Sequence, residues 1–385
     1  MKIERIAAVP LIAHDPFFSV WSQADRLYED DTRHWSQESM RMYGSLMLNG
    51  REYSFMGRKA EREEIPQTRV EMTATSTSYL FENEEALLEV IFTSPLLADD
   101  RRIFSRPCSY IRFRLVRRRN AEALIRLTVS ADFIRRTPGP IFGNVHSGKQ
   151  EDCSFSYAYM YKGNQHILGD SGDNMTINWG NVYLAAKDGE AKLAFHQREG
   201  NLVAEIPFEN REEACVVIAF DDILSIHYLD GARRGYWRKF YHNLPEAIGA
   251  CIREQREVCG RCDAFDRKLE ELALKSGGET YAFLCCVSYR QVMAGHKLIE
   301  DGKGEPVFLS KECDSNGCIG TVDISYPSVP LFLCFAPWLA KAMLRPVFEF
   351  ARKPVWCFDF APHDVGRYPY ATGQIYGVLQ ENKWV

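Results

Sequence analysis

The spacing of apolar residues changes once along the chain, and this change constrains the fold more than any other feature. Up to about residue 235 apolar and polar residues alternate, as in Ile111–Leu115 and Ile125–Val129. A period of two residues is typical of strands with one buried face. After about residue 243 apolar residues recur every three or four positions, which is the period of an α-helix. Short strands followed by helices predict a β-sandwich and then a helical domain, with a boundary near Tyr241.

Three helices are predicted after this boundary. Asn243 and Glu246 have the spacing of an N-cap and its partner, and the amphipathic stripe that follows ends near Gly278. A second helix, from about Thr280 to Ile299, is apolar on nearly every side, so we expect it to be buried. A third runs from about Pro337 to Arg352, with its proline in the first turn.

Composition excludes several classes of function. The formal net charge of -5 provides no basic surface for nucleic acid. The longest apolar run, Val329–Ala340, has 12 residues and two prolines, too few for a membrane span of about 20 residues. No export signal opens the sequence, which predicts a cytoplasmic protein with twelve reduced cysteines. The lone Cys259–Cys262 CxxC pair lacks a second pair, so we expect no metal and no cofactor.

Polar side chains gather on the helix that is predicted to be buried. Arg290 and Lys297 are seven positions apart and would share one helix face. Burying an unpaired charge costs several kcal/mol, so each must reach a partner or a cavity. An internal ion pair that braces two helices and a binding site are both compatible with this pattern.

Two later segments are candidates for an active site. The polar stretch Ser310–Pro327 carries three acidic residues, Glu312, Asp314 and Asp323, and lies between apolar runs, where a fixed polar loop indicates a site. In Phe358–Gly373, His363 and Asp364 stand among aromatic residues. Such surroundings raise carboxylate pKa values and suit a general acid, although a histidine–aspartate pair can equally be a structural brace.

Several long motifs resemble one protein family. KECDSNGCIGTVDISYP begins at Lys311, FDFAPHDVGRYPYATG at Phe358, PLIAHDPFFSVWS at Pro10, TRHW at Thr32 and SYRQ at Ser288. Together they resemble the glutaminase-A-like proteins of bacteria and fungi, over nearly the whole chain. The resemblance implies a β-sandwich packed on an α/α toroid of the kind shared with many glycoside hydrolases. It also implies release of ammonia from glutamine.

The resemblance maps eight residues to a site. We expect three catalytic carboxylates, Glu312, Asp323 and Asp364, and five substrate-binding residues, Arg290, Lys311, Asn316, His363 and Tyr368. In this interpretation Asp364 or Asp323 activates water, Glu312 is the proton donor, and Arg290 holds the substrate carboxylate.

The sequence also departs from the family pattern. Ser36 and Gln37 replace the small residue and glycine that usually follow TRHW, and residues 133–148 are irregular. The predicted organisation is a sandwich over 1–240, a connecting helix over 241–279 and a partial α/α toroid over 280–385. A partial ring would leave apolar helix faces uncovered. We therefore expect self-association or a partner chain that completes the toroid, and little turnover by the isolated chain.

Three functions remain open from the sequence. The leading one is a glutaminase-like hydrolase that acts on the side-chain amide of glutamine or a similar small amide. A glycoside hydrolase of the α/α-toroid type, with two loop carboxylates, is the alternative. The third is a non-catalytic or partial protein that serves in assembly. The first two predict a small-molecule substrate, an amide or a sugar.

Overall fold

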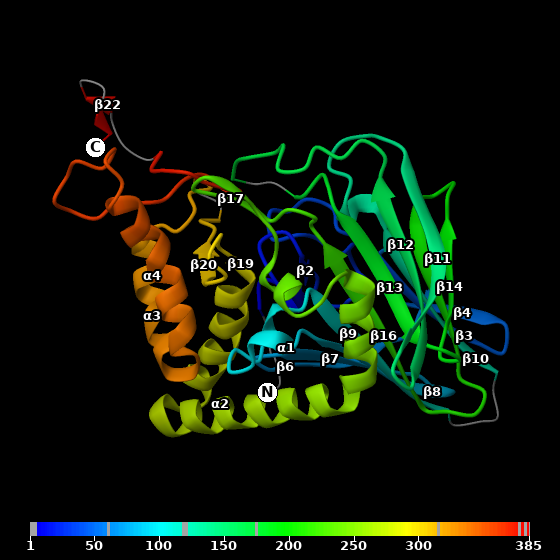
Figure 1. Ribbon diagram of the computed structural model, residues 1–385. Coiled ribbons are helices and arrows are strands. Elements are labelled where there is room, and N and C mark those ends of the chain that lie inside the picture. Colours follow the sequence, from blue (N-terminus) through cyan, green and yellow to red (C-terminus); the bar gives the residue numbers. More distant parts are fainter. Residues whose placement is uncertain are drawn as a thin grey trace.

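The structure is a computed structural model that describes residues 6–59, 62–117, 122–173, 176–313, 316–375, 379–380 and 383–384. Strands occupy most of the chain up to Arg233, and the long helices follow from Leu244 onward. The predicted change from strands to helices is therefore confirmed. Figure 1 shows the strands of the two large sheets on one side of the molecule and the helices α3 and α4 on the other, with α2 running from one side to the other.

Two antiparallel sheets form the sandwich. The six-stranded sheet has the order β14 (Lys192–His196), β15 (Asn201–Pro207), β10 (Ala123–Ser130), β3 (Met42–Leu48), β4 (Arg51–Met56) and β5 (Glu63–Glu64), the last paired in parallel. The eight-stranded sheet has the order β11 (Ile141–Gln150), β12 (Cys153–Lys162), β13 (Asn181–Lys187), β16 (Glu213–Asp221), β9 (Cys108–Arg117), β8 (Ala86–Thr93), β7 (Ser76–Glu82) and β6 (Gln67–Met72). Side chains from both sheets share one large core.

Smaller elements complete the fold. They are the hairpin of β1 (Val9–Ala13) and β2 (Ser19–Ser22), the short helix α1 (Arg101–Ser105), the 3-10 turns η1 (Ala131–Phe133) and η2 (Tyr236–Lys239), the strands β17 (Ile226–Tyr228), β18 (Gly231–Arg233) and β21 (Tyr370–Ala371), the hairpin of β19 (His296–Glu300) and β20 (Pro306–Ser310), and the terminal pair β22 (Leu379–Gln380) and β23 (Lys383–Trp384). The long helices are α2 (Leu244–Ala294), α3 (Val322–Phe335) and α4 (Pro337–Ala351).

Strand β16 is covered on both faces, as its continuous apolar run predicts. Val216 and Ile218 face the core between the sheets, whereas Val217 and Ala219 belong to a second core with the first part of α2. Burying both faces of a strand requires apolar residues at every position. Helix α2 thus supplies the cover on the outer face of the eight-stranded sheet.

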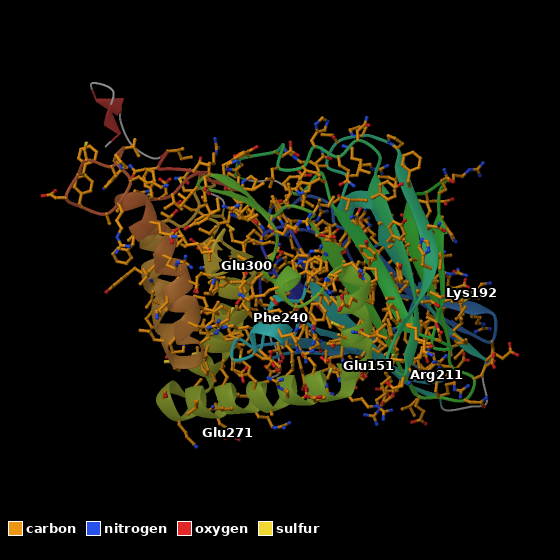
Figure 2. All side chains as sticks on the ribbon, in the orientation of Figure 1. Glu151, Lys192, Arg211, Phe240, Glu271 and Glu300 are labelled. Atoms are coloured by element: carbon orange, nitrogen blue, oxygen red, sulfur yellow. The ribbon has the colours of Figure 1, made fainter. Side chains whose placement is uncertain are left out.

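Helix α2 begins as the sequence predicts and bends where the glycines stand. The Asn243 side chain accepts a hydrogen bond from the Glu246 N–H at 2.9 Å, and the Glu246 carboxylate accepts from the His242 N–H at 2.8 Å. Gly278 has φ 78° and ψ -170°, so the helix is kinked at this residue. Its second part packs with β19, β20, α3 and α4 in a further core. Side chains fill the space between these elements, whereas Glu271 points outward from α2 (Figure 2).

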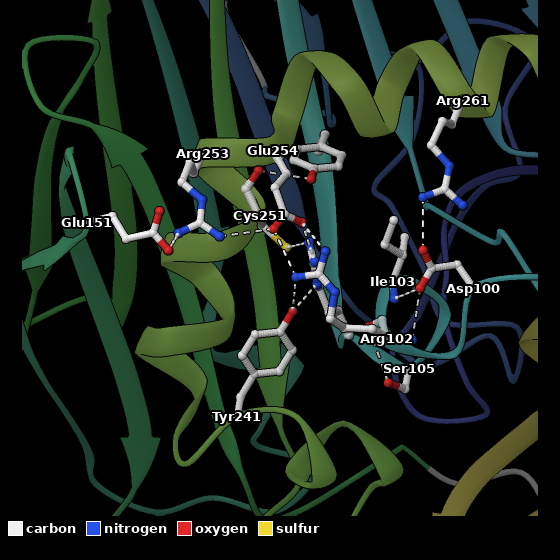
Figure 3. A network of polar contacts seen from close by, with 12 residues as sticks. Asp100, Arg102, Ile103, Ser105, Glu151, Tyr241, Cys251, Arg253, Glu254 and Arg261 are labelled. Atoms are coloured by element: carbon white, nitrogen blue, oxygen red, sulfur yellow. Dashed lines mark hydrogen bonds and ion pairs between the residues drawn. The ribbon is translucent and has the colours of Figure 1, made fainter.

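Charged residues fasten α2 to the sandwich (Figure 3). The Glu254 carboxylate accepts from Arg102 at 2.9 Å and forms an ion pair with the fully buried Arg106. Farther along α2, Arg261 donates to Asp100 at 2.9 Å, and the other oxygen of Asp100 caps α1. These contacts fix the direction in which α2 leaves the sheet.

Two predicted boundaries are wrong. The second helix does not reach Ile299, because the chain leaves the helix at Gly295 and residues 296–300 form strand β19. Lys297 therefore lies on a strand and shares no helix face with Arg290. The polar loop also ends earlier than Pro327, since α3 begins at Val322 with two prolines inside it. A continuous apolar run does not distinguish a buried helix from a buried strand, which explains the first error.

The remaining helix agrees closely with its prediction. Helix α4 covers Pro337–Ala351, one residue shorter than expected at its end. The irregular segment 133–148 includes the end of η1 and most of β11, the edge strand that pairs along its whole length with β12. Within the described residues, no helix is long and apolar enough to cross a membrane.

Candidate functional site

Backbone hydrogen bonds join two loops that are far apart in the chain. The first loop, residues 311–321, follows β20, and the second, residues 362–369, precedes β21. The Ile319 N–H donates to the Gly366 carbonyl at 2.9 Å, the Val365 N–H donates to the Ile319 carbonyl at 3.0 Å, and the Tyr368 N–H donates to the Gly317 carbonyl at 2.9 Å. This short ladder places Cys318 beside Asp364.

Two glycines permit close backbone packing around these loops, Gly317 against Gly172 and Gly366 against Tyr370. Gly317 has φ 72°, and a Cβ atom there would lie 2.4 Å from the Gly172 carbonyl oxygen. Gly366 has φ 146°, and its Cβ would lie 1.9 Å from the Tyr370 carbonyl oxygen. Any other residue would clash with backbone at both positions. Asn316 adds to the first loop by accepting the Cys318 N–H at 2.9 Å.

Asp364 is fully buried and holds its loop. Its Oδ1 accepts hydrogen bonds from the Gly366 N–H at 2.9 Å and the Ile375 N–H at 3.1 Å. Its Oδ2 lies 3.1 Å from Nδ1 of His363. The carboxylate thus connects two backbone N–H groups to one imidazole, an arrangement that orients the ring.

His363 lies between two carboxylates. Besides Asp364, its Nε2 is 3.9 Å from Oδ1 of Asp323, which stands in the first turn of α3. The His363 side chain is 32% exposed, so the ring can exchange protons with solvent. The His363 N–H donates to Oε1 of Gln374 at 2.7 Å, which fixes the residue from the backbone side.

Glu312 and Cys318 complete this cluster. The Thr321 hydroxyl donates to the Glu312 carboxylate at 3.3 Å, and the Glu312 N–H donates to the Cys318 carbonyl at 2.8 Å. Burial raises the pKa of the Cys318 thiol to about 12, with further contributions from the negative charges of Asp364 and Glu312. The thiol therefore stays protonated near neutral pH and donates to Asp364. In the described part of the chain, Cys318, His363 and Asp364 are the residues that could hold a metal ion, with ligand atoms within 4.8 Å of one another.

Lys311 is buried on the other side of the same loop. Its Nζ donates to the Asp173 carbonyl at 2.8 Å and to the Glu312 carbonyl at 3.2 Å, and it lies 4.6 Å from the centre of the Trp35 ring. Burial lowers the pKa of this ammonium. Lys311 therefore connects the first loop (residues 311–321) to Trp35 of the TRHW motif in the sandwich.

A pocket of about 280 Å³ opens beside this contact. Two indoles line it, and both are fixed by hydrogen bonds of their N–H groups: Trp21 to Ser19 at 2.8 Å, and Trp35 to the Pro16 carbonyl at 2.9 Å. The amides of Gln23, Gln37 and Gln291 and the thiol of Cys313 complete its polar lining. Cys313 follows Glu312 directly in the chain, so the first loop (residues 311–321) contributes one residue to the wall of the pocket.

Tyr368 lies behind the site. Its ring packs edge-on against Phe17 at 5.0 Å, and its buried hydroxyl has no hydrogen-bond partner among the described residues. The negative charges of Asp15 and Asp222 act on this hydroxyl. Both carboxylates are buried, and they form ion pairs with Lys297 at 2.7 and 2.6 Å. Burial raises the pKa of Tyr368 well above its ordinary value. Lys297 thus has the ion-pair partners that its burial requires.

Arg290 lies apart from this cluster. It is fully buried between α2 and β7, and its Nη1 donates to the Thr77 hydroxyl at 2.8 Å. Burial lowers its pKa to about 10, although the nearby Asp266 carboxylate opposes this. Among the described residues, none of the contacts of Arg290 involves Glu312, Asp323 or Asp364. The two loops and the first turn of α3 therefore bring together Glu312, Asp323, His363 and Asp364, with Lys311 and Asn316 in the first loop.

Two features of the site were not among the predicted residues. Cys318 was only one of the twelve cysteines expected to be reduced, and the indoles of Trp21 and Trp35 were given no role. The family motifs PLIAHDPFFSVWS and TRHW contain both tryptophans, and these motifs were the available signal. Nothing in the spacing of the cysteines distinguishes Cys318 from the buried thiols of α2.

Three domain families match the chain in sequence order. One described as domain of unknown function DUF4964 matches residues 2–65, one described as domain of unknown function DUF5127 matches residues 75–210, and the glutaminase A six helical-hairpin domain matches residues 278–383. Glutaminase A of Aspergillus oryzae is 21% identical over 96% of this chain. The chain carries a glutaminase A six helical-hairpin domain and is similar to a glutaminase A over nearly its whole length. Its sandwich is thus followed by helices of the six-hairpin type, as the resemblance implies.

Coverage of the relatives is partial. The chain spans 60% of the Aspergillus oryzae protein. A protein named as a probable glutaminase of Arthroderma benhamiae is 32% identical over 28% of this chain and 13% of its own length.

Similar solved structures are distant. A protein named as a kojibiose phosphorylase, from the human microbiome, has a TM-score of 0.33 and 6% identity, with 78% of this chain and 37% of that chain covered. A glycoside hydrolase of family 81 from Clostridium thermocellum has a TM-score of 0.24 and 13% identity, with coverages of 56% and 22%. These scores are too low to support a conclusion about fold or function.

Proposed function

We propose that the protein is a glutaminase-like hydrolase that acts on the side-chain amide of glutamine or of a similar small amide. One observation carries the proposal: the His363 ring stands between the carboxylates of Asp364, at 3.1 Å, and Asp323, at 3.9 Å, in a cluster that includes Glu312. Hydrolysis of an amide needs a group that activates water and a group that protonates the departing ammonia. The names of the relatives as glutaminases add support.

The roles of the carboxylates follow from their exposure. Asp323 is 70% exposed in its side chain and is placed where it can reach a water molecule, whereas Asp364 is fully buried and orients His363. In the proposed reaction a carboxylate takes a proton from water as the hydroxyl adds to the amide carbon. Glu312 or His363 then gives a proton to the nitrogen as the C–N bond breaks, and glutamate and ammonia leave.

Substrate binding is proposed at the pocket next to the first loop. Lys311 provides a positive charge close to the Trp35 wall, and the glutamine side chains of the pocket offer donors and acceptors to an amino-acid head group. Arg290 is not assigned this role, because its donor faces Thr77.

Ammonia release from L-glutamine tests the proposal directly. The full chain is used in excess over substrate, so that a slow reaction is still measurable. We expect release that Asp364→Asn lowers at least about 100-fold, because His363 then loses the carboxylate that orients it for proton transfer. Asp359→Asn is the matched control, since Asp359 is an exposed aspartate of the neighbouring loop. Equal rates for wild type and Asp364→Asn would contradict the proposal.

The pocket gives a specific reason to keep the sugar alternative. Two fixed indoles and three side-chain amides can bind a neutral ring that has apolar faces and hydroxyl edges. Aryl glycosides are therefore assayed in parallel. Their cleavage, with no ammonia from glutamine, would replace the amide reaction by glycoside hydrolysis. No turnover of either substrate class would favour an assembly role.

We also propose that the protein works in the cytoplasm. All twelve cysteines are free thiols, and nine of them are buried or half-buried, five in α2, three in the eight-stranded sheet and Cys318 in the first loop. Free thiols persist in a reducing compartment.

A further inference from the structure

We propose that Cys318, His363 and Asp364 form a binding site for a divalent metal ion of the zinc type. Each residue offers one ligand atom, a sulfur, a ring nitrogen and a carboxylate oxygen, and the three atoms lie within 4.8 Å of one another. Zinc bonds of about 2.0–2.3 Å in tetrahedral geometry place neighbouring ligand atoms roughly 3.3–3.8 Å apart. The 3.1 Å between Nδ1 of His363 and Oδ2 of Asp364 is already close to that separation.

The backbone holds all three residues before any ion binds. The Cys318 N–H donates to Asn316, and its carbonyl accepts from Glu312. The His363 N–H donates to Gln374, and its carbonyl accepts the Val322 N–H at 2.9 Å. A site that is fixed in this way needs little ordering on binding, which favours affinity.

The two oxygens of Asp364 have different tasks. Oδ1 accepts both backbone N–H groups, from Gly366 and Ile375, while Oδ2 faces His363. Hydrogen bonds to one carboxylate oxygen fix the direction of the other, and metal-binding carboxylates are commonly supported in this manner. Oδ2 is thus positioned as a single-oxygen ligand.

Charge around the thiol favours a cation. The carboxylates of Asp364 and Glu312 both act on Cys318, and the guanidinium of Arg367 opposes them. A divalent ion would offset this negative charge and stabilise the thiolate, which is the metal-binding form of cysteine.

The ligand atoms select the class of metal. A thiolate with an imidazole suits zinc and chemically similar ions, whereas calcium and magnesium prefer oxygen ligands alone. Three protein ligands also leave a fourth position open, as in zinc sites that bind water or substrate. This assignment contradicts the expectation of no metal that the cysteine spacing suggested. It goes beyond the amide reaction, because binding of the ion does not depend on the substrate.

Cobalt(II) titration of the full, reduced and chelator-treated chain tests the site. Cobalt takes the place of zinc and reports thiolate ligation through a charge-transfer absorption in the near ultraviolet. We expect this absorption with one equivalent of cobalt, and its loss when zinc is added. Cys318→Ser is expected to remove it and to weaken zinc binding at least about 100-fold. Cys357→Ser, which changes an exposed thiol, should leave both unchanged.

A second variant keeps the test decisive if Cys318→Ser does not fold. His363→Gln retains the thiol and should weaken zinc binding by a similar factor, with folding checked by thermal unfolding. A folded wild-type chain without the absorption would overturn the proposal, as would cobalt binding that both variants leave unchanged. Ammonia release is measured separately, with and without chelator, so a failure of the metal site and a failure of the amide reaction are distinguishable.

Discussion

The carboxylate of Asp364 has no exposure to solvent, yet it accepts hydrogen bonds from two backbone N–H groups and contacts an imidazole. A buried N–H that loses its acceptor costs about 1–3 kcal/mol. The Asp364 side chain therefore contributes both to the stability of the fold and to the proposed reaction. Two substitutions distinguish these contributions.

Asp364→Asn and Asp364→Ala should differ in stability. Asparagine keeps an oxygen for the Gly366 and Ile375 N–H groups, so we expect a loss of about 1 kcal/mol or less in the free energy of unfolding. Alanine leaves both N–H groups without an acceptor, and we expect a loss of about 2–4 kcal/mol. Urea unfolding of both variants measures the difference. Equal losses would mean that water replaces the carboxylate oxygen.

The sequence identified the residues of this site better than it identified their neighbours. Glu312 was selected because a polar loop between apolar runs indicates a site, and His363 and Asp364 because they stand among aromatic residues. The contact of Cys318 with Asp364 depends on the backbone hydrogen bonds between residues 317–319 and 365–368. No periodic pattern in the sequence predicts these hydrogen bonds. Arg290 was expected beside the carboxylates, but a charge on a buried helix does not reveal which neighbour receives it.

Helix α2 contacts the sandwich through a buried carboxylate as well as through the arginines of Figure 3. Asp266 accepts from Thr73 at 2.5 Å and from Thr75 at 2.7 Å, and only 5% of it is exposed. Burial raises its pKa from 3.8 to about 6, against the effect of both hydroxyls and of Arg290. Because its pKa is higher in the folded state, Asp266 lowers stability as pH rises from about 4 to about 6.

Asp266→Asn should therefore change the pH dependence of unfolding. Buried His34 and His296 act in the opposite direction, since burial lowers the pKa of each to about 4 and stability falls as pH drops from 6.5 to 4. In the Asp266→Asn variant, the loss of unfolding free energy between pH 6.5 and pH 4 should be larger than in wild type by roughly 2 kcal/mol. Unfolding free energies at pH 4, 5, 6 and 7 measure it. Glu271→Gln, at an exposed position that points outward from the same helix, is the control. An unchanged slope would mean that Asp266 is ionised throughout.

Elements with a clear period were predicted well, and those without one were not. The alternation of Ile111 and Phe113 predicted β9, and the Asn243–Glu246 spacing predicted the start of α2. Residues 296–299 are all buried, so neither period is visible there and the β19–β20 hairpin was missed. Two internal prolines similarly concealed α3, because proline usually ends a helix.

The surface of the whole molecule carries large apolar side chains on its helical side. The most exposed on α3 and α4 are Tyr326 at 80%, Leu333 at 58% and Phe348 at 55%. Scattered apolar residues are normal on a surface, but a group on adjacent helices indicates a contact. We propose that this face is covered by a second copy or by a partner chain.

Leu333→Glu should reduce self-association. A charge at a packed apolar contact opposes association, so we expect a dissociation constant at least about 10-fold higher than for wild type. Light scattering over a series of protein concentrations measures it. Phe142→Glu, at an exposed position on the distant strand β11, should have no effect. A wild-type chain that remains monomeric at every concentration would contradict the prediction.

The thiols give a further property of the whole chain. All twelve cysteines are free, and nine are buried or half-buried. Titration of denatured protein with a thiol reagent, without reductant, should count nearly twelve. A count near zero would mean that the cysteines are paired by oxidation and that the proposed reducing compartment is wrong.

Helix α2 belongs to two cores, and residues 274–281, around its Gly278 kink, are exposed at every position. Amide groups in such a stretch have little to protect them from exchange with solvent deuterium. The buried residues on both sides of the kink, Leu269 before it and Met293 after it, lie in one core, which also contains sandwich residues such as Leu96. Opening of the kink therefore leaves that core intact, and residues 274–281 should exchange well before the buried turns that flank them.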